Sequence, residues 1–370
     1  MESKMKRILV YGMTNNPGGI ESYLMGMLYK IKKYNVQFDF ITDFDSMAYY
    51  DEAVKNGARV YFVPAKGKGL FKHWKKIADV LKEHPEYDTV YFNILDAGAV
   101  FSILIPWIMR KKIIVHSHNG STEKVKLHKM CRPILNRLTN CYAACSNLAA
   151  KYMFGDSVCE KKNVLIIPNA IDTEKFDIDI ETRNKYRKKL GIESAFVICH
   201  IGRMSEQKNP LRMIDIFDEV YKKDNTARLL YIGEGELHAE VYSYVKNKES
   251  KDAVNFLGIR HDIPALLQCS DMFFLPSLYE GLPIVAVEAQ ASGLPCILST
   301  AITKEVDITG NVEFVDLDQG DSVWAEKILE KKKNERKSCK KKVTDAGYDK
   351  STVPEDMRKL FTYMGGKIND

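Results

Sequence analysis

Short β-rich runs of Val, Ile, Leu and aromatic residues alternate with longer, more polar helical stretches along the whole chain. This alternation is typical of parallel sheets whose strands are joined by helices. In the first half, the runs predicted to form strands are residues 7–11, 37–41, 58–63, 89–92, 112–115 and 141–144. In the second half they are residues 196–201, 227–232, 254–257, 272–275 and 295–298. The pattern therefore predicts an α/β protein with two doubly wound, Rossmann-like halves.

The two halves are expected to meet near residues 166–172, after which a polar stretch up to Gly191 predicts a helix leading into the second sheet. A chain of 370 residues is long enough for about two domains. We therefore expect a first domain over residues 1–170 and a second over residues 171–350. The charge run at residues 331–342 predicts the solvated face of a helix.

The longest apolar run, residues 97–109, contains Pro106 and is shorter than the roughly 20 residues that a membrane span needs. It predicts a buried helix. The N-terminal residues lack the apolar core of a signal peptide. Eight cysteines show neither a C-x-x-C pair nor a zinc-type spacing, so we expect reduced thiols and a cytoplasmic protein.

The net charge of +6 is unevenly distributed, because residues 1–170 carry 25 Lys and Arg against 15 Asp and Glu. A basic half suits anionic lipid or a phosphate-bearing substrate. Phe71, Trp74 and Ile77 lie among lysines on a predicted helix with apolar and basic faces, which suits either a membrane surface or packing on the chain's own sheet. No aromatic-rich RNA signature or zinc-finger spacing accompanies the charge, so nucleic acid is not an expected partner.

One segment, residues 277–295, carries the most chemical information. Glu280 and Glu288 are separated by seven residues, Pro283 suits the start of a helix, and Gly293 suits its end. Free amides at a helix start attract an anion, and flanking carboxylates accept hydrogen bonds from hydroxyls. The segment fits a sugar nucleotide, although an ordinary buried strand–helix unit with solvated glutamates has the same pattern.

Residues that follow predicted strands are the next candidates, because ligands of parallel sheets bind beyond the carboxyl ends of the strands. Gly18 and Gly19 follow the first strand and would let a phosphate approach backbone amides. The fifth strand is followed by His116, His118 and Asn119, whose side chains could orient a sugar hydroxyl or carry a proton. The same features also suit a tight turn and a structural histidine.

In the second half, Arg203 and Lys208 follow a strand and together can neutralise a diphosphate leaving group. A glycine turn at residues 233–235 and the segment Gly258-Ile259-Arg260 could border a nucleotide base through backbone groups. The spacing G-x-G-x-x-G of dinucleotide oxidoreductases is absent, which argues against that class.

In chain order, these motifs closely resemble those of the family 4 retaining glycosyltransferases, above all the bacterial enzymes of capsule and exopolysaccharide synthesis. The resemblance covers nearly the whole chain and is strongest over residues 196–300. It rests on Gly-Gly at 18–19, His-Ser-His-Asn at 116–119, Pro-Asn-Ala-Ile-Asp at 168–172, Gly-Arg at 202–203, Lys-Asn at 208–209, Gly-Glu-Gly at 233–235 and the Glu-x7-Glu segment.

The resemblance implies a GT-B fold, in which two Rossmann-like domains face a central cleft and the C-terminal domain holds the nucleotide. It also implies a C-terminal helix over residues 351–370 that crosses back to the first domain. The segment from Phe314 onward and the tail both fit that crossing.

The resemblance further implies roles for individual residues. Glu288 would bind the ribose and Glu280 the transferred sugar, while Arg203 and Lys208 would hold the diphosphate. Loop residues Gly281, Leu282 and Pro283 would lie against the sugar and phosphate, with amide donors from the first two only. Gly19 would lie beneath the diphosphate. His118 is the preferred histidine near the sugar, with His116 and Asn119 as acceptor-side candidates.

The implied reaction transfers a hexose or N-acetylhexosamine, with retention, from a nucleotide sugar to a saccharide acceptor. UDP is the expected nucleotide, and the expected acceptor is lipid-linked, so the enzyme would be cytoplasmic and peripheral at the plasma membrane. No metal or other cofactor is implied. D-x-D strings at residues 43–45, 177–179 and 316–318 are expected by chance in a chain rich in acidic residues.

Two alternatives stay open at this stage. A sugar-nucleotide 2-epimerase shares the fold, but it would need acid and base carboxylates around the sugar. A non-catalytic partner could bind a sugar nucleotide without transferring it. Consumption of a UDP-sugar only when an acceptor is present separates both from a glycosyltransferase.

Overall fold

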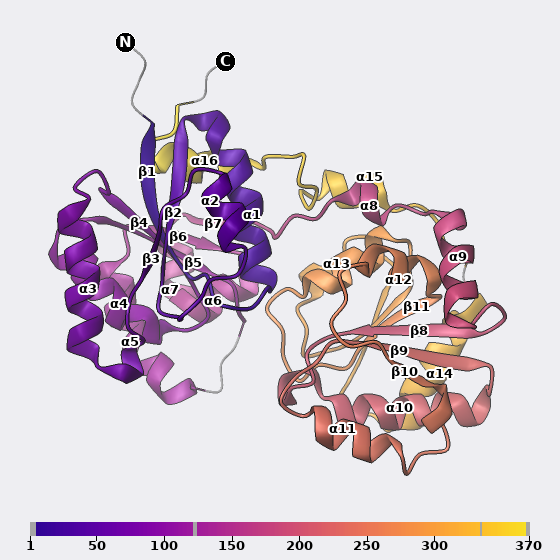
Figure 1. Ribbon diagram of the computed structural model, residues 1–370. Helices are drawn as coiled ribbons and strands as arrows, with labels where there is room; N and C mark the ends of the chain where they lie inside the picture. Colours follow the sequence, from indigo (N-terminus) through magenta and orange to yellow (C-terminus); the bar gives the residue numbers. More distant parts are fainter. Residues whose placement is uncertain (1–4, 121–123, 334, 368–370) are drawn as a thin grey trace. The chain divides into compact units, whose positions relative to one another are not determined.

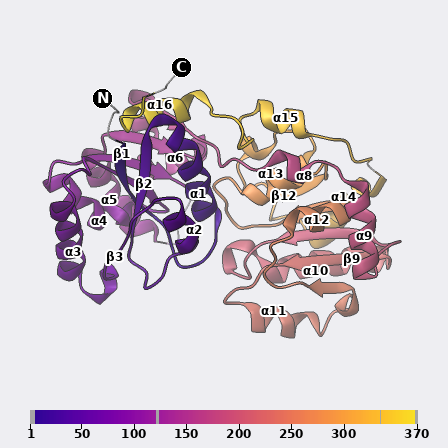
Figure 2. The same ribbon diagram turned by 45° about the horizontal axis from the view of Figure 1, so that its top comes forward.

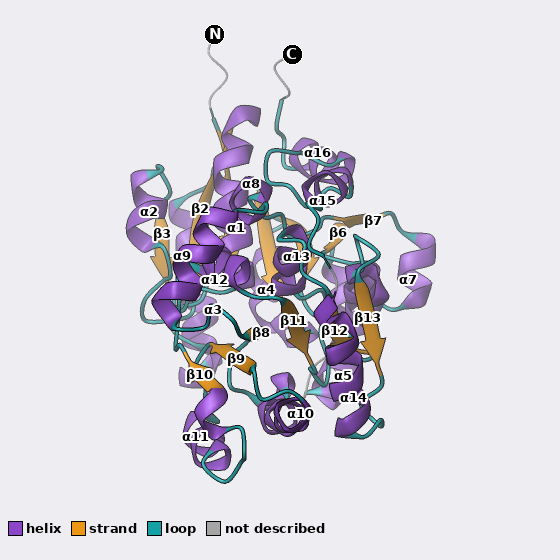
Figure 3. Ribbon diagram, turned by 90° about the vertical axis from the view of Figure 1, so that its right-hand side faces the viewer, coloured by secondary structure: helices purple, strands orange, loops and turns teal. Residues whose placement is uncertain are grey.

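The protein is described by a computed structural model that covers residues 5–120, 124–333 and 335–367. The chain forms two compact units: one contains the residues up to Ala170 and those from Val353 onward, and the other contains Ile171–Thr352. Each unit is a parallel sheet with helices on both faces (Figures 1 and 3). The predicted α/β class and the two Rossmann-like halves are therefore confirmed.

The first unit contains a seven-stranded sheet in the order β3-β2-β1-β4-β5-β6-β7. Its strands are β1 (Lys6–Tyr11), β2 (Val36–Thr42), β3 (Val60–Phe62), β4 (Thr89–Ile94), β5 (Lys112–Ser117), β6 (Cys141–Ala144) and β7 (Val164–Ile166). Its helices are α1 (Gly19–Ile31), α2 (Tyr50–Lys55), α3 (Leu70–Glu83), α4 (Val100–Ile108), α5 (Val125–Leu138), α6 (Asn147–Phe154), α7 (Asp156–Lys161) and α16 (Glu355–Tyr363). All six strands predicted for this half are present, whereas β7 was not predicted.

The core of the first unit lies between the sheet and helices α1, α2 and α16. All seven residues of β2 are buried, as expected for a strand covered on both faces. The C-terminal helix α16 lies with the elements of the first unit (Figure 2) and joins this core through Met357, Leu360 and Phe361. It lies beside β7 (Figure 1). Two residues far apart in sequence are also linked here, because the Ile166 amide donates to Asp356 at 2.9 Å.

Helices α3, α4 and α5 pack side by side on the other face of the first sheet (Figure 1). Residues 97–109 contain α4, but the prediction of a buried helix is only half right. Ser102, Ile103 and Pro106 are buried, whereas Phe101, Trp107 and Ile108 are exposed to solvent. One side of α4 therefore packs on the sheet and the other side is bare.

The second unit contains a six-stranded sheet in the order β10-β9-β8-β11-β12-β13. Its strands are β8 (Phe196–Ile201), β9 (Ala227–Ile232), β10 (Val254–Phe256), β11 (Met272–Leu275), β12 (Cys296–Ser299) and β13 (Val312–Val315). Its helices are α8 (Thr173–Phe176), α9 (Ile180–Leu190), α10 (Pro210–Lys223), α11 (His238–Val245), α12 (Ile263–Cys269), α13 (Ile284–Ala291), α14 (Asp321–Glu330) and α15 (Lys340–Asp345). Helices α10, α11 and α14 cover one face of the sheet, and α9, α12 and α13 the other (Figure 1).

Two expectations for this unit are wrong. Phe314 does not begin a crossing segment, because it lies in β13 and pairs with Leu298 of β12. The charge run at 331–342 is not one solvated helix either. It contains a short 3-10 turn and the start of α15, and between them Arg336 donates to the Gln268 carbonyl at 2.7 Å and also to the Ser292 carbonyl. These carbonyls end helices α12 and α13, so Arg336 caps both.

No helix within the described parts of the chain combines the length and the apolar content needed to cross a membrane.

Candidate active site

Each sheet has one position where the chain reverses the direction in which strands are added. In the first unit it lies between β1 and β4, and in the second between β8 and β11. Loops that leave neighbouring strands here turn to opposite faces of the sheet and open a crevice at its carboxyl edge. Most site residues predicted from the sequence lie in loops that follow strands, whereas His116 lies within β5, Gly19 begins α1 and Glu288 lies on α13. We describe each unit separately.

In the second unit, the loop after β8 and the loop after β11 are tied together by hydrogen bonds. The Leu278 amide donates to the Gln207 carbonyl at 2.8 Å. The Gln207 side-chain amide donates to the Tyr279 carbonyl at 3.0 Å, and the Asn209 side chain donates to the Pro276 carbonyl at 3.3 Å. Because β8 and β11 are adjacent strands, these bonds make one rigid platform of two segments that are about 70 residues apart in sequence.

The centre of this platform is the buried carboxylate of Glu280. It accepts hydrogen bonds from the Lys208 ammonium, from the Ser277 hydroxyl at 2.9 Å and from the Gln207 amide at 3.3 Å. The ion pair with Lys208 compensates the charge of the carboxylate, which would otherwise be costly to bury. The structure therefore brings together Lys208 and Glu280, two residues that the sequence pattern placed on different loops.

Glycines let three loop backbones pack against each other at the carboxyl ends of β8, β9 and β10. Gly233 has a φ of +134°, and a Cβ atom there would lie 2.1 Å from the Gly202 carbonyl oxygen. At Gly235 a Cβ atom would lie 2.5 Å from the Met204 carbonyl oxygen. The Gly233 amide donates to the Gly258 carbonyl at 2.9 Å, which brings the third loop into the same layer. The Gly-Glu-Gly turn is thus required by backbone packing.

The remaining predicted residues at this edge differ in how exposed their side chains are and in whether they are already paired. The Arg203 side chain is 67% exposed and lies 3.9 Å from Glu236, so it is only weakly held. Ile259 is also exposed. Arg260, in contrast, forms a two-pronged ion pair with Asp262 at 2.6 and 2.8 Å.

Helix α13 starts and stops close to where the sequence predicts. Pro283 occupies the N-cap, one residue before the predicted position, and Gly293 lies past the helix end with a φ of +72°. Gly281, Leu282 and Pro283 are buried in the loop before it. Glu288 lies on the second turn, half-buried, and its carboxyl group has no hydrogen bond or ion pair within the described residues. Burial raises the pKa of Glu288 to about 8.

His200 on β8 is a residue of this edge that sequence reasoning missed. It is fully buried, and its Nδ1 lies 3.1 Å from the Phe274 carbonyl oxygen. Its Nε2 has no partner within the described residues, and a Cβ atom on Gly202 would lie 2.9 Å from it. Burial lowers the pKa of His200 to about 3, so the ring is neutral. A lone histidine inside an apolar strand gives no signal in the sequence, because it also suits a satisfied core residue.

In the first unit, His118 follows β5 and is oriented by Asn93 at the end of β4. The Asn93 side-chain amide lies 3.5 Å from the Tyr11 carbonyl, which points its Oδ1 toward His118 Nε2 at 2.9 Å. Nε2 therefore carries the proton and Nδ1 keeps its lone pair, with no partner within the described residues. Burial lowers the pKa of His118 to about 3. The ring is thus a neutral acceptor, suited to a hydroxyl group. Asn93 was not predicted.

His116 lies beneath His118, with 4.1 Å between the ring centroids, and is fully buried. Its Nδ1 lies 2.5 Å from the Tyr91 hydroxyl, which in turn lies 3.1 Å from the Tyr23 hydroxyl. Burial raises the pKa of both tyrosines, so both hydroxyls keep their protons. Of the two imidazoles, only His118 has exposed surface. His116 has the surroundings of a supporting residue.

The two glycines before α1 have different surroundings. Gly18 is the N-cap in an extended conformation, and a Cβ atom there would lie 2.8 Å from the Glu21 carboxylate. Gly19 has nothing within 4 Å of the position of a Cβ atom. Packing therefore does not require glycine at 19, and the backbone there is open to a ligand. Asn119 is half-buried, and its side-chain oxygen accepts from the Gly120 amide at 3.0 Å.

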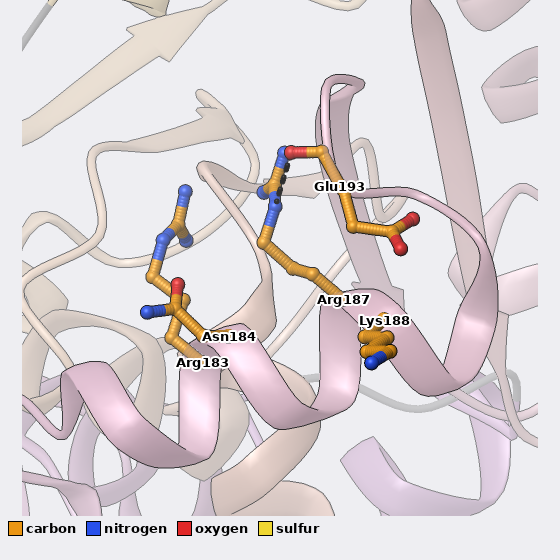
Figure 4. Close-up of a pocket in the computed structure, with 5 residues that line it drawn as sticks. All are labelled: Arg183, Asn184, Arg187, Lys188 and Glu193. Atoms are coloured by element: carbon orange, nitrogen blue, oxygen red, sulfur yellow. Dashed lines mark hydrogen bonds between the residues drawn. The ribbon is translucent and has the colours of Figure 1, made fainter.

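A surface hollow beside α9 contains no predicted site residue (Figure 4). It is lined by Arg183, Asn184, Arg187, Lys188 and Glu193. Arg187 donates to the Glu193 carbonyl at 3.2 Å, drawn as a dashed line, and both arginines pair with Asp271 at the start of β11. These bonds anchor α9 to the sheet, so the arginines have a structural role.

Several carboxylates of the D-x-D strings have local partners. Asp43 pairs with Lys66 at 3.2 Å and Asp45 with Lys68 at 3.2 Å. Asp179 caps α9 by accepting from the Thr182 amide at 3.0 Å.

Two known protein families match this chain, one in each unit. Residues 17–175 match the family described as Glycosyltransferase Family 4, and residues 182–345 match the family described as Glycosyl transferases group 1. A Bacillus subtilis glycosyltransferase named EpsF is 32% identical over 364 residues, which cover 94% of each chain. The chain belongs to the family 4 glycosyltransferases. The resemblance seen in the sequence is therefore confirmed.

Two further proteins are informative relatives of this glycosyltransferase. The Escherichia coli UDP-Gal:alpha-D-GlcNAc-diphosphoundecaprenol alpha-1,3-galactosyltransferase is 28% identical over 72% of each chain. The solved structure of Anabaena HepE in complex with UDP and glucose superposes with a TM-score of 0.79 at 20% identity, covering 98% of this chain and 99% of HepE. The structural likeness confirms the GT-B fold.

The raised pKa of Glu288 predicts a pH-dependent stability. Its carboxyl titrates near 8 in the folded state and at the ordinary value of 4.5 when unfolded. Between these values the folded state binds a proton that the unfolded state has lost, so stability falls as pH rises. Glu288→Gln should leave the unfolding free energy nearly unchanged near pH 4.5 and raise it by several kcal/mol at about pH 8.5. The upper limit is about 5 kcal/mol, from about 1.4 kcal/mol for each pH unit between the two pKa values. Urea unfolding at both pH values measures this difference. The exposed Glu249→Gln is the control, and equal effects of the two variants would contradict the assignment.

The glycine packing predicts a folding defect at Gly233. Gly233→Ala should cost more than about 3 kcal/mol, because it adds a backbone clash to an unfavourable φ. Gly191→Ala is the matched control, since Gly191 has a φ of +66° but nothing within 4 Å of a Cβ atom. It should cost only about 1 kcal/mol. The two unfolding free energies, measured in urea, should not be equal.

Proposed function

We propose that this glycosyltransferase moves a hexose or N-acetylhexosamine from a UDP-sugar to a saccharide acceptor, with retention of anomeric configuration. The observation that carries the proposal is the platform in the second unit. It presents two basic side chains, Lys208 and Arg203, together with two carboxylates, Glu280 and Glu288, at the carboxyl edge of one sheet. Two cations suit a diphosphate, and carboxylates suit the hydroxyls of ribose and hexose.

The nucleotide is proposed to be UDP. This choice is supported by the E. coli relative, whose name specifies UDP-Gal, and by HepE, whose structures contain UDP, glucose and UDP-glucose. Glu288 is proposed to bind the ribose hydroxyls, since its carboxyl group is the unpaired one of the two. The loop 258–260 is proposed to border the base, mainly through Gly258 and Ile259, because Arg260 is already paired with Asp262.

Lys208 and Glu280 are proposed to exchange partners when the donor binds. Without donor they neutralise each other. The diphosphate then competes for Lys208. One oxygen of Glu280 becomes free to accept a hydrogen bond from a hydroxyl of the transferred sugar. Ser277 and Gln207 keep Glu280 in place during this exchange. The amides of Gly281 and Leu282, before the N-cap Pro283, are proposed to add donors to the sugar and phosphate.

In the first unit, His118 Nδ1 is proposed to accept a hydrogen bond from a hydroxyl of the sugar. Asn93 would keep the proton of the ring on Nε2. Gly19 is proposed to give the diphosphate access to the backbone, with Gly18 shaping the loop. Asn119 stays a candidate on the acceptor side. His116, which is buried, is proposed to support His118 rather than to contact acceptor.

In the proposed reaction, one bond to the anomeric carbon breaks and another forms. The bond between the anomeric carbon and the diphosphate oxygen breaks, and its electron pair stays on the diphosphate. The acceptor hydroxyl forms the new bond on the same face of the sugar, and its proton passes to the departing diphosphate oxygen. Arg203 and Lys208 stabilise the charge that develops on the leaving group, so no protein nucleophile, metal ion or cofactor is required.

The acceptor is proposed to be a lipid-linked saccharide in capsule or exopolysaccharide synthesis, and the enzyme to act in the cytoplasm at the inner face of the plasma membrane. Support comes from the E. coli relative, whose name gives alpha-D-GlcNAc-diphosphoundecaprenol as the acceptor. Nucleic acid is not a proposed partner.

The donor proposal predicts a specific thermal shift. In the presence of EDTA, UDP and one or more UDP-sugars should raise the melting temperature, whereas GDP and ADP should not, because a ligand that binds only the folded state stabilises it. Glu288→Ala should abolish most of the shift. Arg203→Ala should keep the shift but lower turnover about 10²-fold, since its charge is needed mainly in the transition state.

Acceptor-dependent consumption of the same UDP-sugar, followed by NMR of the product's anomeric proton, completes the test. Consumption without acceptor would indicate an epimerase, and binding without consumption would indicate a non-catalytic protein. Equal and negligible effects of Glu288→Ala and Arg203→Ala would overturn the site assignment.

A further inference from the structure

A basic stretch of the first unit contains helices with exposed apolar side chains. Residues 97–138 contain eight Lys and Arg and one Asp or Glu. Helices α4 and α5 lie in this stretch, and α3 packs beside α4. Together, α3, α4 and α5 form the outer layer on one face of the first sheet (Figure 1). We call their solvent-exposed side the α3–α5 face.

Helix α5 has two different sides. Its inner side, with His128, Cys131, Leu135 and Leu138, is buried. Its outer side carries Lys126, Met130, Ile134 and Arg137 at successive helical turns, and all four are exposed. Met130 is 66% exposed. Two apolar side chains thus lie in a row with a cation at each end, although the helix already has an apolar side to pack on the sheet.

Helices α3 and α4 add an aromatic patch to the same layer. The Trp74 indole N–H donates to the Phe101 carbonyl at 2.6 Å, which joins α3 to the start of α4. The Phe71 ring packs edge-on against Trp74 at 5.6 Å and is itself 82% exposed. At the other end of α4, Trp107 is exposed and Ile108 is 58% exposed. Large apolar side chains are therefore exposed to solvent at both ends of α4.

The cations of the α3–α5 face are not neutralised by the protein. Within the described residues, Lys72, Lys75, Lys76, Lys126, Lys129 and Arg137 are all exposed, and none takes part in an ion pair. The acidic residues of α3, Asp79 and Glu83, lie toward its C-terminal end. In the described part of the second unit, only three large apolar side chains are exposed, namely Ile180, Ile259 and Leu278. The combination is therefore not found in the described part of the second unit, whereas the first unit has further exposed apolar side chains outside this face, such as Tyr50 and Phe62.

We propose that the α3–α5 face docks the protein on the surface of an anionic lipid bilayer. Unpaired Lys and Arg attract acidic headgroups, at about 1 kcal/mol for each residue near the surface. Exposed Trp, Phe, Ile and Met then enter the boundary between headgroups and acyl chains. The association is peripheral, because no described helix is suited to span the bilayer.

The chemistry of this face favours lipid over other anionic partners. Nucleic acid would use the cations but would leave Ile108, Met130 and Ile134 exposed to water. A protein partner would have to match apolar and basic groups that are interleaved at single-residue spacing, whereas a fluid bilayer accepts both in any arrangement. Membrane docking fits the lipid-linked acceptor of the proposed function but does not depend on nucleotide binding. Vesicle binding can therefore be measured without nucleotide.

The test is binding of the full chain to vesicles of phosphatidylcholine alone or with about 30% phosphatidylglycerol, measured by co-sedimentation. Binding should require the anionic lipid and should weaken by about tenfold or more when salt is raised from about 0.1 to 0.5 M. Reversing three cations, Lys126→Glu with Lys129→Glu and Arg137→Glu, should weaken it at least about tenfold. Replacing two apolar residues, Trp107→Ser with Ile108→Ser, should have a similar effect.

The matched control makes the same kinds of change on α9 of the second unit, where Ile180, Lys185 and Lys188 are exposed. Ile180→Ser with Lys185→Glu and Lys188→Glu should leave vesicle binding within about twofold of wild type. Melting temperatures confirm that all variants fold, and the thermal shift with a UDP-sugar should be unchanged in each. Loss of that shift in wild type would refute the donor proposal and leave this one standing.

Four results would overturn the inference. The first is no binding of wild type to anionic vesicles. The second is equal binding to phosphatidylcholine alone, which would remove the role of the cations. The third is an equal loss of binding in the face variants and in the α9 control. The fourth is binding to duplex DNA or single-stranded RNA as tight as to anionic vesicles, which would show that the face recognises negative charge alone and has no preference for lipid.

Discussion

The burial of one charged group, the carboxylate of Glu280, determines the organisation of the candidate donor site. A buried carboxylate is costly unless it is paired and hydrogen-bonded. Here three donors from two loops satisfy it, namely Lys208, Ser277 and Gln207. The loops after β8 and β11 must therefore stay together for the unit to fold well. This requirement gives a preformed site at the carboxyl edge of the sheet, and it places the ammonium group of Lys208 beside a carboxylate that a sugar could also use.

Glycines extend the same platform toward β9 and β10. Because Gly233 and Gly235 have no side chains, the loops after β8 and β9 approach to backbone contact. Gly19 in the first unit differs, since the space around it is open. Glycines that look alike in sequence thus have different surroundings: closely packed loop backbones in one unit, and open space beside the backbone in the other.

Much of the fold could be predicted from the sequence because buried parallel strands are short apolar runs with clear boundaries. The misses have physical reasons. β7 and β13 are short edge strands of three and four residues with only partly buried side chains, so their patterns are weak. Residues 331–342 are rich in Lys, which favours a helix, but Arg336 binds the carbonyls at the ends of α12 and α13 and holds the chain in an irregular path. For the site, residue types and spacing indicated Lys208, Glu280 and Glu288, whereas the tautomer-setting Asn93 and the buried His200 depend on contacts between strands that only the fold creates.

The most direct measurement of the central claim is calorimetric titration of UDP and of the matching UDP-sugar into wild type, Lys208→Gln and Glu280→Gln. If Lys208 binds the diphosphate and Glu280 binds the sugar, Lys208→Gln weakens both ligands by at least about tenfold. Glu280→Gln then leaves UDP within about threefold of wild type and weakens the UDP-sugar by at least about tenfold. Equal affinities of all three proteins for both ligands would contradict the claim that this pair forms the donor site.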